Sequence, residues 1–221
     1  MDAEIQKRWA GPEQAVSLLK RKIRPTWLWA FQATFFSGLL IHLYRMANYI
    51  MVDDTPYFSY NVQNTSYFGR WLLQYAGAIS SYMELPALNA LLSLFYLGIF
   101  AAILVELAGV TSRLFCWLLG LTLAALPAFT TTLMFGYAAD AYMLALILSG
   151  AAALLVCRMK GWKGVALGAL CLMLSMAIYQ CYLDVTVFLC LLVILLGGLF
   201  EKRPWREQLA QAGRMLLMGV L

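Results

Sequence analysis

Long apolar runs follow one another along almost the whole of this chain. They fall near residues 27–50, 85–107, 114–134, 138–157, 165–182 and 184–200, and a seventh begins at about 208. Runs of roughly 17–25 apolar residues are what a helix needs to cross a bilayer. Hydrophobic residues make up 63% of the 221 residues and charged residues only 12%, whereas a soluble domain is about 25% charged. We therefore predict an all-α membrane protein, a polytopic helical bundle of about six to seven transmembrane helices.

The fifth and sixth runs form one nearly unbroken apolar stretch from Val165 to Phe200. As a single helix this stretch would be about 54 Å long, well beyond the roughly 30 Å thickness of the hydrocarbon core. A polar cluster at residues 179–184 interrupts it, so we expect the chain to turn back there. The last run, which reaches Leu221, is too short to cross the core. We therefore expect an incomplete last helix and a chain that is the N-terminal part of a longer protein.

Basic residues are distributed unevenly between alternate loops. Of the 16 Lys and Arg residues, only Arg45 and Arg70 lie on one predicted side of the membrane. Because loops rich in Lys and Arg stay in the cytoplasm, we predict a multi-pass protein with a cytoplasmic N-terminus. This placement also explains the net charge of +5. No basic stripe with interleaved aromatic residues predicts binding to nucleic acid, and the oligomeric state is left open.

The predicted organisation has two parts and one large loop. Residues 1–25 form a cytoplasmic segment, residues 26–221 form the membrane domain, and residues 51–84 form an external loop. Within this loop, apolar residues recur at spacings of three and four, at Phe68, Trp71, Leu72, Tyr75 and Ile79. This spacing places them on one face of a helix, and such a helix lies in the membrane interface rather than across it. We therefore predict an interfacial amphipathic helix over residues 66–81.

Charged and aromatic residues gather at the outer rim of the membrane domain. Asp53 and Asp54 follow the first run, Arg45 lies near the end of that run, and Arg70 opens the predicted interfacial helix. A carboxylate can remove a proton from an attacking hydroxyl, or help to hold a divalent cation. Arginine binds phosphate through a planar fork of donors, and aromatic rings such as those of Tyr57 and Trp71 stack on sugar rings. These residues suit transfer of a group from a lipid-linked phosphate to a hydroxyl.

Simpler explanations exist for each of these residues. Adjacent aspartates after a helix are common turn residues in contact with solvent. Arg45 can extend to lipid headgroups, and the aromatic residues fit an interfacial belt. Two aspartates are too few ligands to decide whether a metal is used, so a divalent cation stays open and no other cofactor is expected.

Three further acidic residues lie at the ends of apolar runs. Asp140 and Asp184 each lie at the outer start of a run, where capping of a helix N-terminus is the simpler explanation. The alternative is that both carboxylates face the same external cavity as Asp53. Glu106, near the inner end of the second run, is expected to pair with Arg113 and is given no catalytic role.

Four short motifs occur along the chain in the order typical of a known family. They are Val52-Asp53-Asp54, Phe68-Gly69-Arg70-Trp71-Leu72, Asp140-Ala141-Tyr142 and Tyr179-Gln180-Cys181-Tyr182. Together they resemble the bacterial polytopic O-antigen (serotype-converting) glucosyltransferases of type II, within the C-type (GT-C) glycosyltransferase superfamily. The resemblance extends from the first apolar run to the sixth.

This resemblance implies a membrane glycosyltransferase. It implies transfer of a sugar, glucose in this family, from a polyprenyl-phosphate donor to lipopolysaccharide O-antigen or another cell-surface glycan, at the periplasmic face of the bacterial cytoplasmic (inner) membrane. It also implies that the catalytic acidic group is Asp53 or Asp54, acting as a base in an inverting reaction. The substrate-binding residues are then expected to be Arg45, Arg70, Tyr57, Trp71, Asp140, Tyr179, Gln180 and Asp184.

Two other classes of function are consistent with a chain of this kind. A transporter or flippase for a lipid-linked sugar would carry charged residues near the bilayer midplane, whereas here the polar residues cluster at the rim. A non-catalytic scaffold subunit would tolerate alanine at Asp53 and Arg70 without loss of activity in its complex.

Overall fold

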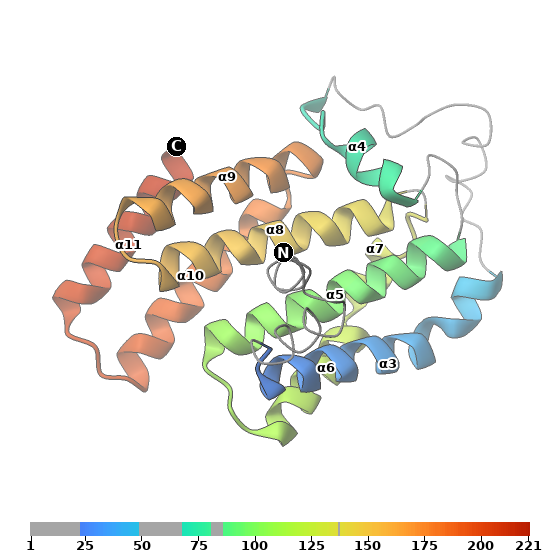
Figure 1. Cartoon of the computed structure of the whole chain (residues 1–221), viewed down its shortest axis with the longest axis horizontal. Coiled ribbons are helices and arrows are strands. Elements are labelled where there is room, and N and C mark those ends of the chain that lie inside the picture. Colours follow the sequence, from blue (N-terminus) through green and yellow to red (C-terminus); the bar gives the residue numbers. More distant parts are fainter. Residues whose placement is uncertain (1–22, 49–67, 81–85, 137) are drawn as a thin grey trace, which may run out of the picture.

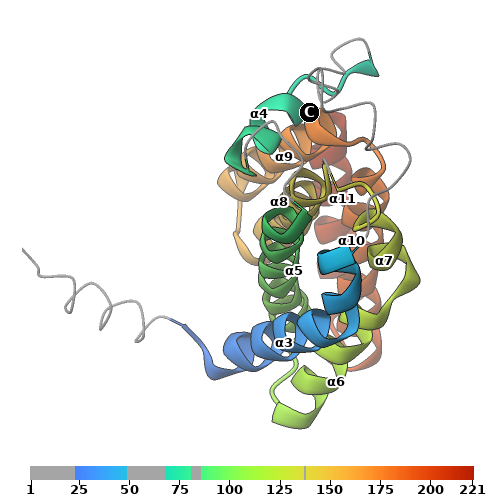
Figure 2. The same ribbon diagram turned by 90° about the vertical axis from the view of Figure 1, so that its right-hand side faces the viewer.

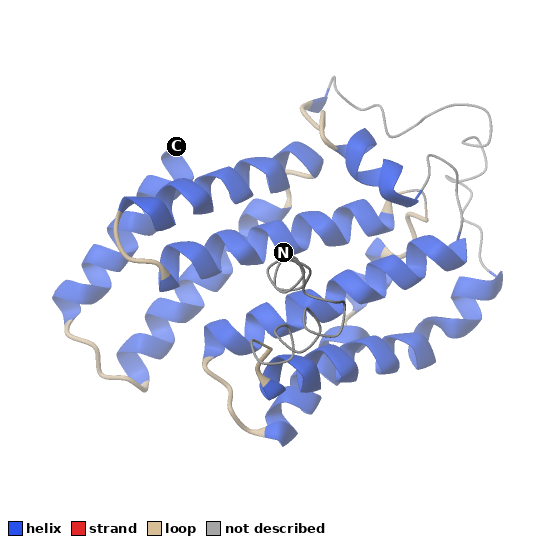
Figure 3. Ribbon diagram, viewed as in Figure 1, coloured by secondary structure: helices blue, strands red, loops and turns tan. Residues whose placement is uncertain are grey.

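The computed structural model describes residues 23–48, 68–80, 86–136 and 138–221 of the chain. All regular secondary structure in these residues is helical (Figure 3). Several of the helices are long and apolar, which confirms the predicted all-α membrane protein.

The long helices follow the predicted apolar runs. They are α3 (Pro25–Asn48), α5 (Pro86–Ala108), α6 (Arg113–Ala125), α8 (Ala139–Arg158), α9 (Trp162–Ile178), α10 (Tyr182–Leu199) and α11 (Trp205–Val220) (Figure 1). The third run is divided, because Leu126 is extended before Pro127 and the short helix α7 (Pro127–Thr132) begins there. The turn predicted inside the longest apolar stretch is confirmed at residues 179–181, between α9 and α10.

Three of these helices are long and apolar enough to cross a membrane. They are residues Ala87–Ala108 of α5, together with α8 and α10, while α6 and α9 are apolar but shorter. Helix α9 has 17 residues, at the lower limit of about 17 residues for a span, whereas α6 has 13 and is shorter than that limit. The larger number of six to seven spans stays a prediction.

Helix α8 lies at the centre of the bundle. It packs against α5, α9 and α10, while α3 packs against both α5 and α6. Helices α3 and α6 lie on one side of this arrangement and α9 and α11 on the other (Figure 2). The main hydrophobic cluster includes Phe100 of α5, Leu146 of α8 and Leu189 of α10. This cluster joins the long helices and fixes their relative positions.

Small and hydroxyl-bearing residues allow close contact between the helices. A Cβ atom on Gly120 of α6 would lie 2.9 Å from the carbonyl oxygen of Ala30 in α3, so a larger residue would push these helices apart. The Ser149 hydroxyl of α8 donates to the carbonyl of Tyr182 at 2.9 Å and lies 2.8 Å from the Thr186 hydroxyl. Hydrogen bonds of this kind stabilise helix pairs in a membrane by about 0.6 kcal/mol each.

The bundle has two ends that differ in chemistry. We call the end that holds Arg24, Glu106 and Arg158 the inner end, and the end that holds Arg70, Asp140 and Tyr179 the outer end. His42 of α3 is buried between them, with its Nε2 atom 3.0 Å from the carbonyl oxygen of Ala124 in α6. This histidine therefore connects two helices.

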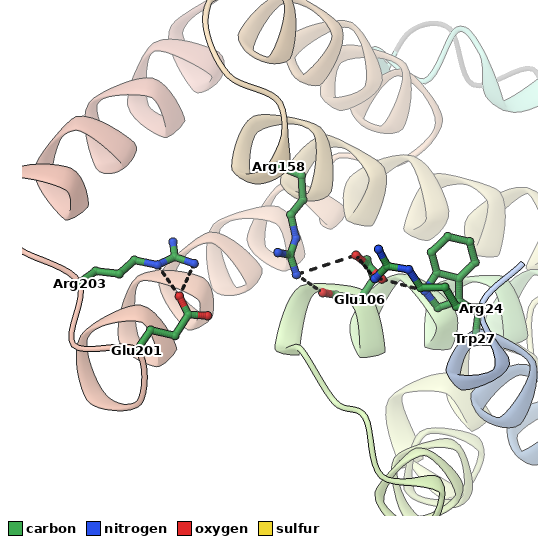
Figure 4. Close-up of polar contacts among 6 residues, drawn as sticks. All are labelled: Arg24, Trp27, Glu106, Arg158, Glu201 and Arg203. Atoms are coloured by element: carbon green, nitrogen blue, oxygen red, sulfur yellow. Dashed lines mark hydrogen bonds and ion pairs between the residues drawn. The ribbon is translucent and has the colours of Figure 1, made fainter. Parts of the chain in front are cut away.

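Glu106 is the centre of a polar network at the inner end (Figure 4). Arg24 donates two hydrogen bonds to its carboxylate, at 2.7 and 2.9 Å, and Trp27 Nε1 donates a third at 2.9 Å. Arg158 Nη2 lies 4.0 Å from the same carboxylate. The predicted pairing with Arg113 is wrong, because the start of α3 lies against the end of α5 and supplies the partner instead.

The predicted interfacial helix is shorter than expected. Helix α4 covers only Leu73–Gly77 and continues as a 3₁₀ turn over Ala78–Ser80. Gly69 has a φ of +76°, in the left-handed region, so a right-handed helix cannot run through it from residue 66. The prediction of a helix starting there is therefore wrong.

The exposed face of this segment is the apolar face that the sequence predicted, except that Leu72 is partly buried. Leu73 and Ala76 are buried among residues of α8 and α9. The exposed side chains are Phe68, Trp71, Tyr75 and Ile79. Aromatic and apolar side chains that point away from a membrane protein are suited to contact with the lipid interface.

Candidate functional site

The segment around Arg70 is attached to the turn between α9 and α10. The Leu72 N–H donates to the carbonyl of Ala177 at 3.0 Å, and the Gln180 side-chain amide donates to the carbonyl of Phe68 at 2.8 Å. A Cβ atom on Gly69 would lie only 3.0 Å from Gln180 Nε2. Two hydrogen bonds and one close approach therefore hold residues 68–72 at the outer end.

Arg70 lies over the ring of Tyr179. The guanidinium carbon is 4.4 Å from the centre of that ring. The Tyr179 ring in turn lies 4.7 Å from the ring of Tyr142 and 5.9 Å from that of Tyr182. A guanidinium over an aromatic face is stabilised by about 0.5–1 kcal/mol at exposed sites. Rings from α8, α10 and the turn between α9 and α10 therefore fix the position of the Arg70 side chain.

The Arg70 guanidinium has unused hydrogen-bonding capacity. Its Nε atom is buried and has no hydrogen-bond partner among the described residues. A buried polar group without a partner costs about 1–3 kcal/mol, and more when it is charged. An anion beside the guanidinium would balance its positive charge. Arg70 is therefore well placed to bind an anionic group such as a phosphate.

Tyr179 presents a neutral ring to Arg70. A hydrogen bond with Cys181 is the largest cause that raises the pKa of Tyr179 above its ordinary value, and burial raises it further. The positive charge of Arg70 acts in the opposite direction. With a raised pKa the phenol stays protonated at neutral pH, so this ring supports Arg70 and does not act as a base.

The two predicted carboxylates at the outer helix starts lie in different surroundings. Asp140 is in the first turn of α8 and is only 1% exposed, while Asp184 is in the first turn of α10 and exposed. Neither caps its helix, because the N-cap residues are Ala138 and Cys181. The capping explanation is therefore wrong, although both carboxylates lie near the positive end of a helix dipole. Asp140 is enclosed within the bundle, whereas Asp184 is accessible.

The structure brings some of the predicted site residues together. Arg70, Tyr179 and Gln180 form one cluster, and Trp71 beside them is 47% exposed. Within this cluster Tyr179 and Gln180 contact the protein itself, so they position the Arg70 segment. Asp53, Asp54 and Tyr57 lie outside the described residues, and Arg45 is placed only as a residue of α3.

Two residues that support the outer end were not predicted from the sequence as site residues. Tyr142 completes the stack of rings beneath Arg70. Asn89 is 1% exposed, and its side-chain amide donates to the carbonyl of Gly136 at 2.7 Å, so it fixes the segment that leads into α8. Asn89 could have been found in the sequence as an amide side chain in the first turn of an otherwise apolar helix. The motif Asp140-Ala141-Tyr142 was the signal for Tyr142.

The described residues hold no group of three His, Cys, Asp or Glu side chains arranged as metal ligands. Any cation held by Asp53 and Asp54 would lie in a part of the chain beyond those residues.

A comparison with known protein families gives one finding. The family model described as Glucosyl transferase GtrII matches residues 44–221, from the last turn of α3 through α11. This match confirms the resemblance carried by the four sequence motifs. No curated protein and no solved structure matches the chain.

Proposed function

Because the chain belongs to the Glucosyl transferase GtrII family, we propose that it transfers glucose from a polyprenyl-phosphate donor to a glycan hydroxyl. The family itself indicates a glucosyltransferase, while the donor, the acceptor and the catalytic residues are our proposal. The proposed acceptor is lipopolysaccharide O-antigen or another cell-surface glycan. The observation that carries the proposal is Arg70, fixed over Tyr179 with an Nε atom that has no hydrogen-bond partner among the described residues.

A lipid-linked phosphate matches the chemistry of the outer end. Its phosphate is a dianion or monoanion that accepts hydrogen bonds in the geometry of a guanidinium fork. Its tail dissolves in the hydrocarbon that contacts the exposed apolar side chains of helices such as α5 and α10. The exposed Trp71 beside Arg70 offers a ring face for the sugar. Donor phosphate, sugar and tail would thus each meet a suitable surface.

The proposed chemistry uses one aspartate as a general base. Asp53 or Asp54 removes the proton from the acceptor hydroxyl as its oxygen attacks the anomeric carbon. A new bond forms between this carbon and the acceptor oxygen, and the bond from the carbon to the phosphate oxygen breaks. Polyprenyl phosphate leaves with the electron pair, stabilised by Arg70. Attack from the face opposite the phosphate inverts the configuration through an oxocarbenium-like state.

The distribution of charges in the apolar spans favours surface chemistry over transport. In α5, α8 and α10 the charged residues are Glu106, Asp140, Arg158 and Asp184. Each of these lies in the first or last turn of its helix. A transporter for a lipid-linked sugar would need polar or charged groups along a path near the midplane.

The inner end supports the proposed orientation in a bacterial inner membrane. Arg24 and Arg158 meet there at Glu106, and Arg214 donates to the carbonyl of Met159 at 2.9 Å. Basic residues gathered at one end favour a cytoplasmic position for that end. We therefore propose that residues 26–221 form the transferase domain, with Arg70 on the periplasmic side and residues 1–25 in the cytoplasm.

The test is transfer of glucose in membranes that contain the chain. Asp53→Asn and Asp54→Asn, singly and together, are assayed with polyprenyl-phosphate glucose and an O-antigen acceptor. We expect the double variant to lose transfer by at least about 100-fold, the scale of general-base catalysis. Glu207→Gln, at an exposed acidic residue near the start of α11, is the control and should transfer normally. Full activity in the double variant would refute the aspartate base.

A further inference from the structure

His42 is the single histidine of the chain, and it lies six residues before the end of α3. Its side chain is only 4% exposed, and its Nε2 atom lies 3.0 Å from the carbonyl oxygen of Ala124 in α6. A carbonyl oxygen only accepts hydrogen bonds, so the Nε2 atom must carry a proton and act as the donor. The direction of this hydrogen bond between two helices is therefore fixed.

The acceptor carbonyl is available because α6 ends just after Ala124. Leu126 has an extended ψ of 129°, and Pro127 follows it at the start of α7. The last carbonyls of a helix have no N–H partner within that helix. Ala124 is fully buried, so its carbonyl needs a donor from another part of the protein. His42 supplies that donor from α3, and the hydrogen bond thus depends on the break in the third apolar run.

His42 is the last buried side chain that the structure describes in α3. One turn earlier, a Cβ atom on Gly38 would lie 2.6 Å from a methyl carbon of Leu94, so α3 packs closely against α5 there. The next two side chains after the histidine, Leu43 and Tyr44, are 59% and 81% exposed. Among the described side chains, His42 is therefore the buried contact nearest to the end of α3.

The segment that follows this helix end carries the proposed base. Helix α3 ends at Asn48, and Asp53 comes five residues later. Five residues span at most about 17 Å when fully extended. The position of the helix end therefore restricts where the carboxylate of Asp53 or Asp54 can lie.

We propose that His42 is a positioning residue for sugar transfer, because its hydrogen bond to Ala124 fixes the end of α3 that precedes the aspartate pair. This inference rests on the proposed function, since it takes Asp53 or Asp54 as the general base. The histidine itself takes no part in the proton transfer. Arg70 is attached to the turn between α9 and α10 instead. Loss of the His42 hydrogen bond should therefore displace the base and leave donor binding unchanged.

Two amide substitutions that differ in reach test this hydrogen bond in the full chain. In His42→Gln the amide nitrogen can take the place of Nε2 and donate to Ala124, whereas in His42→Asn the side chain is one CH₂ shorter and cannot reach. With polyprenyl-phosphate glucose as donor, we expect His42→Asn to lower kcat per folded molecule about tenfold and to change the donor KM less than about twofold. His42→Gln should keep the kcat of the unmodified chain. His42→Leu, which also lacks a donor, gives the same reading if His42→Asn does not fold.

Thr34→Val is the matched control in the same helix. Thr34 is fully buried, and its hydroxyl donates at 2.9 Å to the carbonyl of Ala30, which also belongs to α3. The substitution thus removes a buried hydrogen bond within α3 and leaves the bond between α3 and α6 intact, so kcat should not change. Equal losses of kcat in Thr34→Val and His42→Asn would overturn the inference, because kcat would then follow the general stability of α3. A loss in His42→Gln as large as that in His42→Asn would overturn it as well.

Hydrogen exchange, measured by mass spectrometry without any substrate, separates the two levels of the proposal. Backbone amides of residues 45–48 should exchange about threefold faster in His42→Asn than in His42→Gln, because the end of α3 opens more often. Equal exchange, or an unchanged kcat in His42→Asn, would overturn the positioning role while the proposed function stands. If the unmodified chain transfers no glucose from polyprenyl-phosphate glucose, the proposed function fails, and with it the role of His42 in transfer.

Discussion

The two ends of the bundle hold their arginines in different ways. At the inner end Arg24 and Arg158 both reach the carboxylate of Glu106. At the outer end Arg70 lies over the uncharged ring of Tyr179, and its Nε atom has no hydrogen-bond partner among the described residues. A charge paired within the protein holds helices together. A charge that lies over an aromatic ring has no counter-charge among the described residues, so the outer end is where we propose that an anionic ligand binds.

The largest expected effect comes from removing the outer arginine. Arg70→Ala should lower kcat/KM for polyprenyl-phosphate glucose about 100-fold, because the leaving phosphate loses its charged donors. The thermal midpoint in detergent should change little. Arg206→Ala is a matched control, since Arg206 also lies near an aromatic ring, 5.7 Å from the centre of the Trp205 ring, but in the first turn of α11. Equal losses of kcat/KM in Arg70→Ala and Arg206→Ala would show that the arginine at the outer end has no special role in the reaction.

Removing the inner carboxylate should affect stability rather than catalysis. Glu106→Gln should destabilise the folded chain by about 2 kcal/mol, because Arg24 and Arg158 lose their counter-charge in a partly buried setting. The measurement is the thermal midpoint in detergent together with kcat/KM per folded molecule. A fall in kcat/KM with an unchanged midpoint would show that the inner end belongs to the functional site.

The ring beneath Arg70 should act through position. Tyr179→Leu should raise the KM for the donor about fivefold and leave kcat nearly unchanged, because the stacking that fixes Arg70 contributes about 0.5–1 kcal/mol. Tyr179→Phe keeps the ring, so its KM for the donor should stay close to that of the unmodified chain. The double variant with Tyr179→Leu and Arg70→Ala should have the same kcat/KM for the donor as Arg70→Ala alone. Additive losses would mean that Tyr179 has a role separate from Arg70.

The smallest expected effect is at the amide that holds the outer segment. Gln180→Ala removes the hydrogen bond to the Phe68 carbonyl, which is exposed and contributes about 0.5 kcal/mol. Hydrogen exchange at the Leu72 N–H should become about twofold faster, because its bond to Ala177 then opens more often. Unchanged exchange would show that the bond to Ala177 holds the segment without Gln180.

Local features of the molecule could be predicted from the sequence. The apolar runs located α3, α5, α8 and α10, and the polar cluster at residues 179–184 located a turn. Such features depend on the length and hydrophobicity of neighbouring residues. The interfacial helix was predicted too long, because its apolar spacing did not reveal the left-handed conformation of Gly69. The aspartate pair stays a prediction, since Asp53 and Asp54 lie outside the described residues.

The sequence by itself determined that this chain is a helical membrane protein with a glucosyltransferase motif order. The apolar runs and the short motifs each consist of residues that are close together in the sequence, so no tertiary contact is needed to recognise them. Only the tertiary structure decided which groups meet. Glu106 is joined to Arg24 across 82 positions of the chain, and Gln180 is joined to Phe68 across 112. No local pattern specifies such a partner, because it depends on how α3, α5 and α9 pack. That packing pairs the inner charges and leaves Arg70 with an aromatic ring.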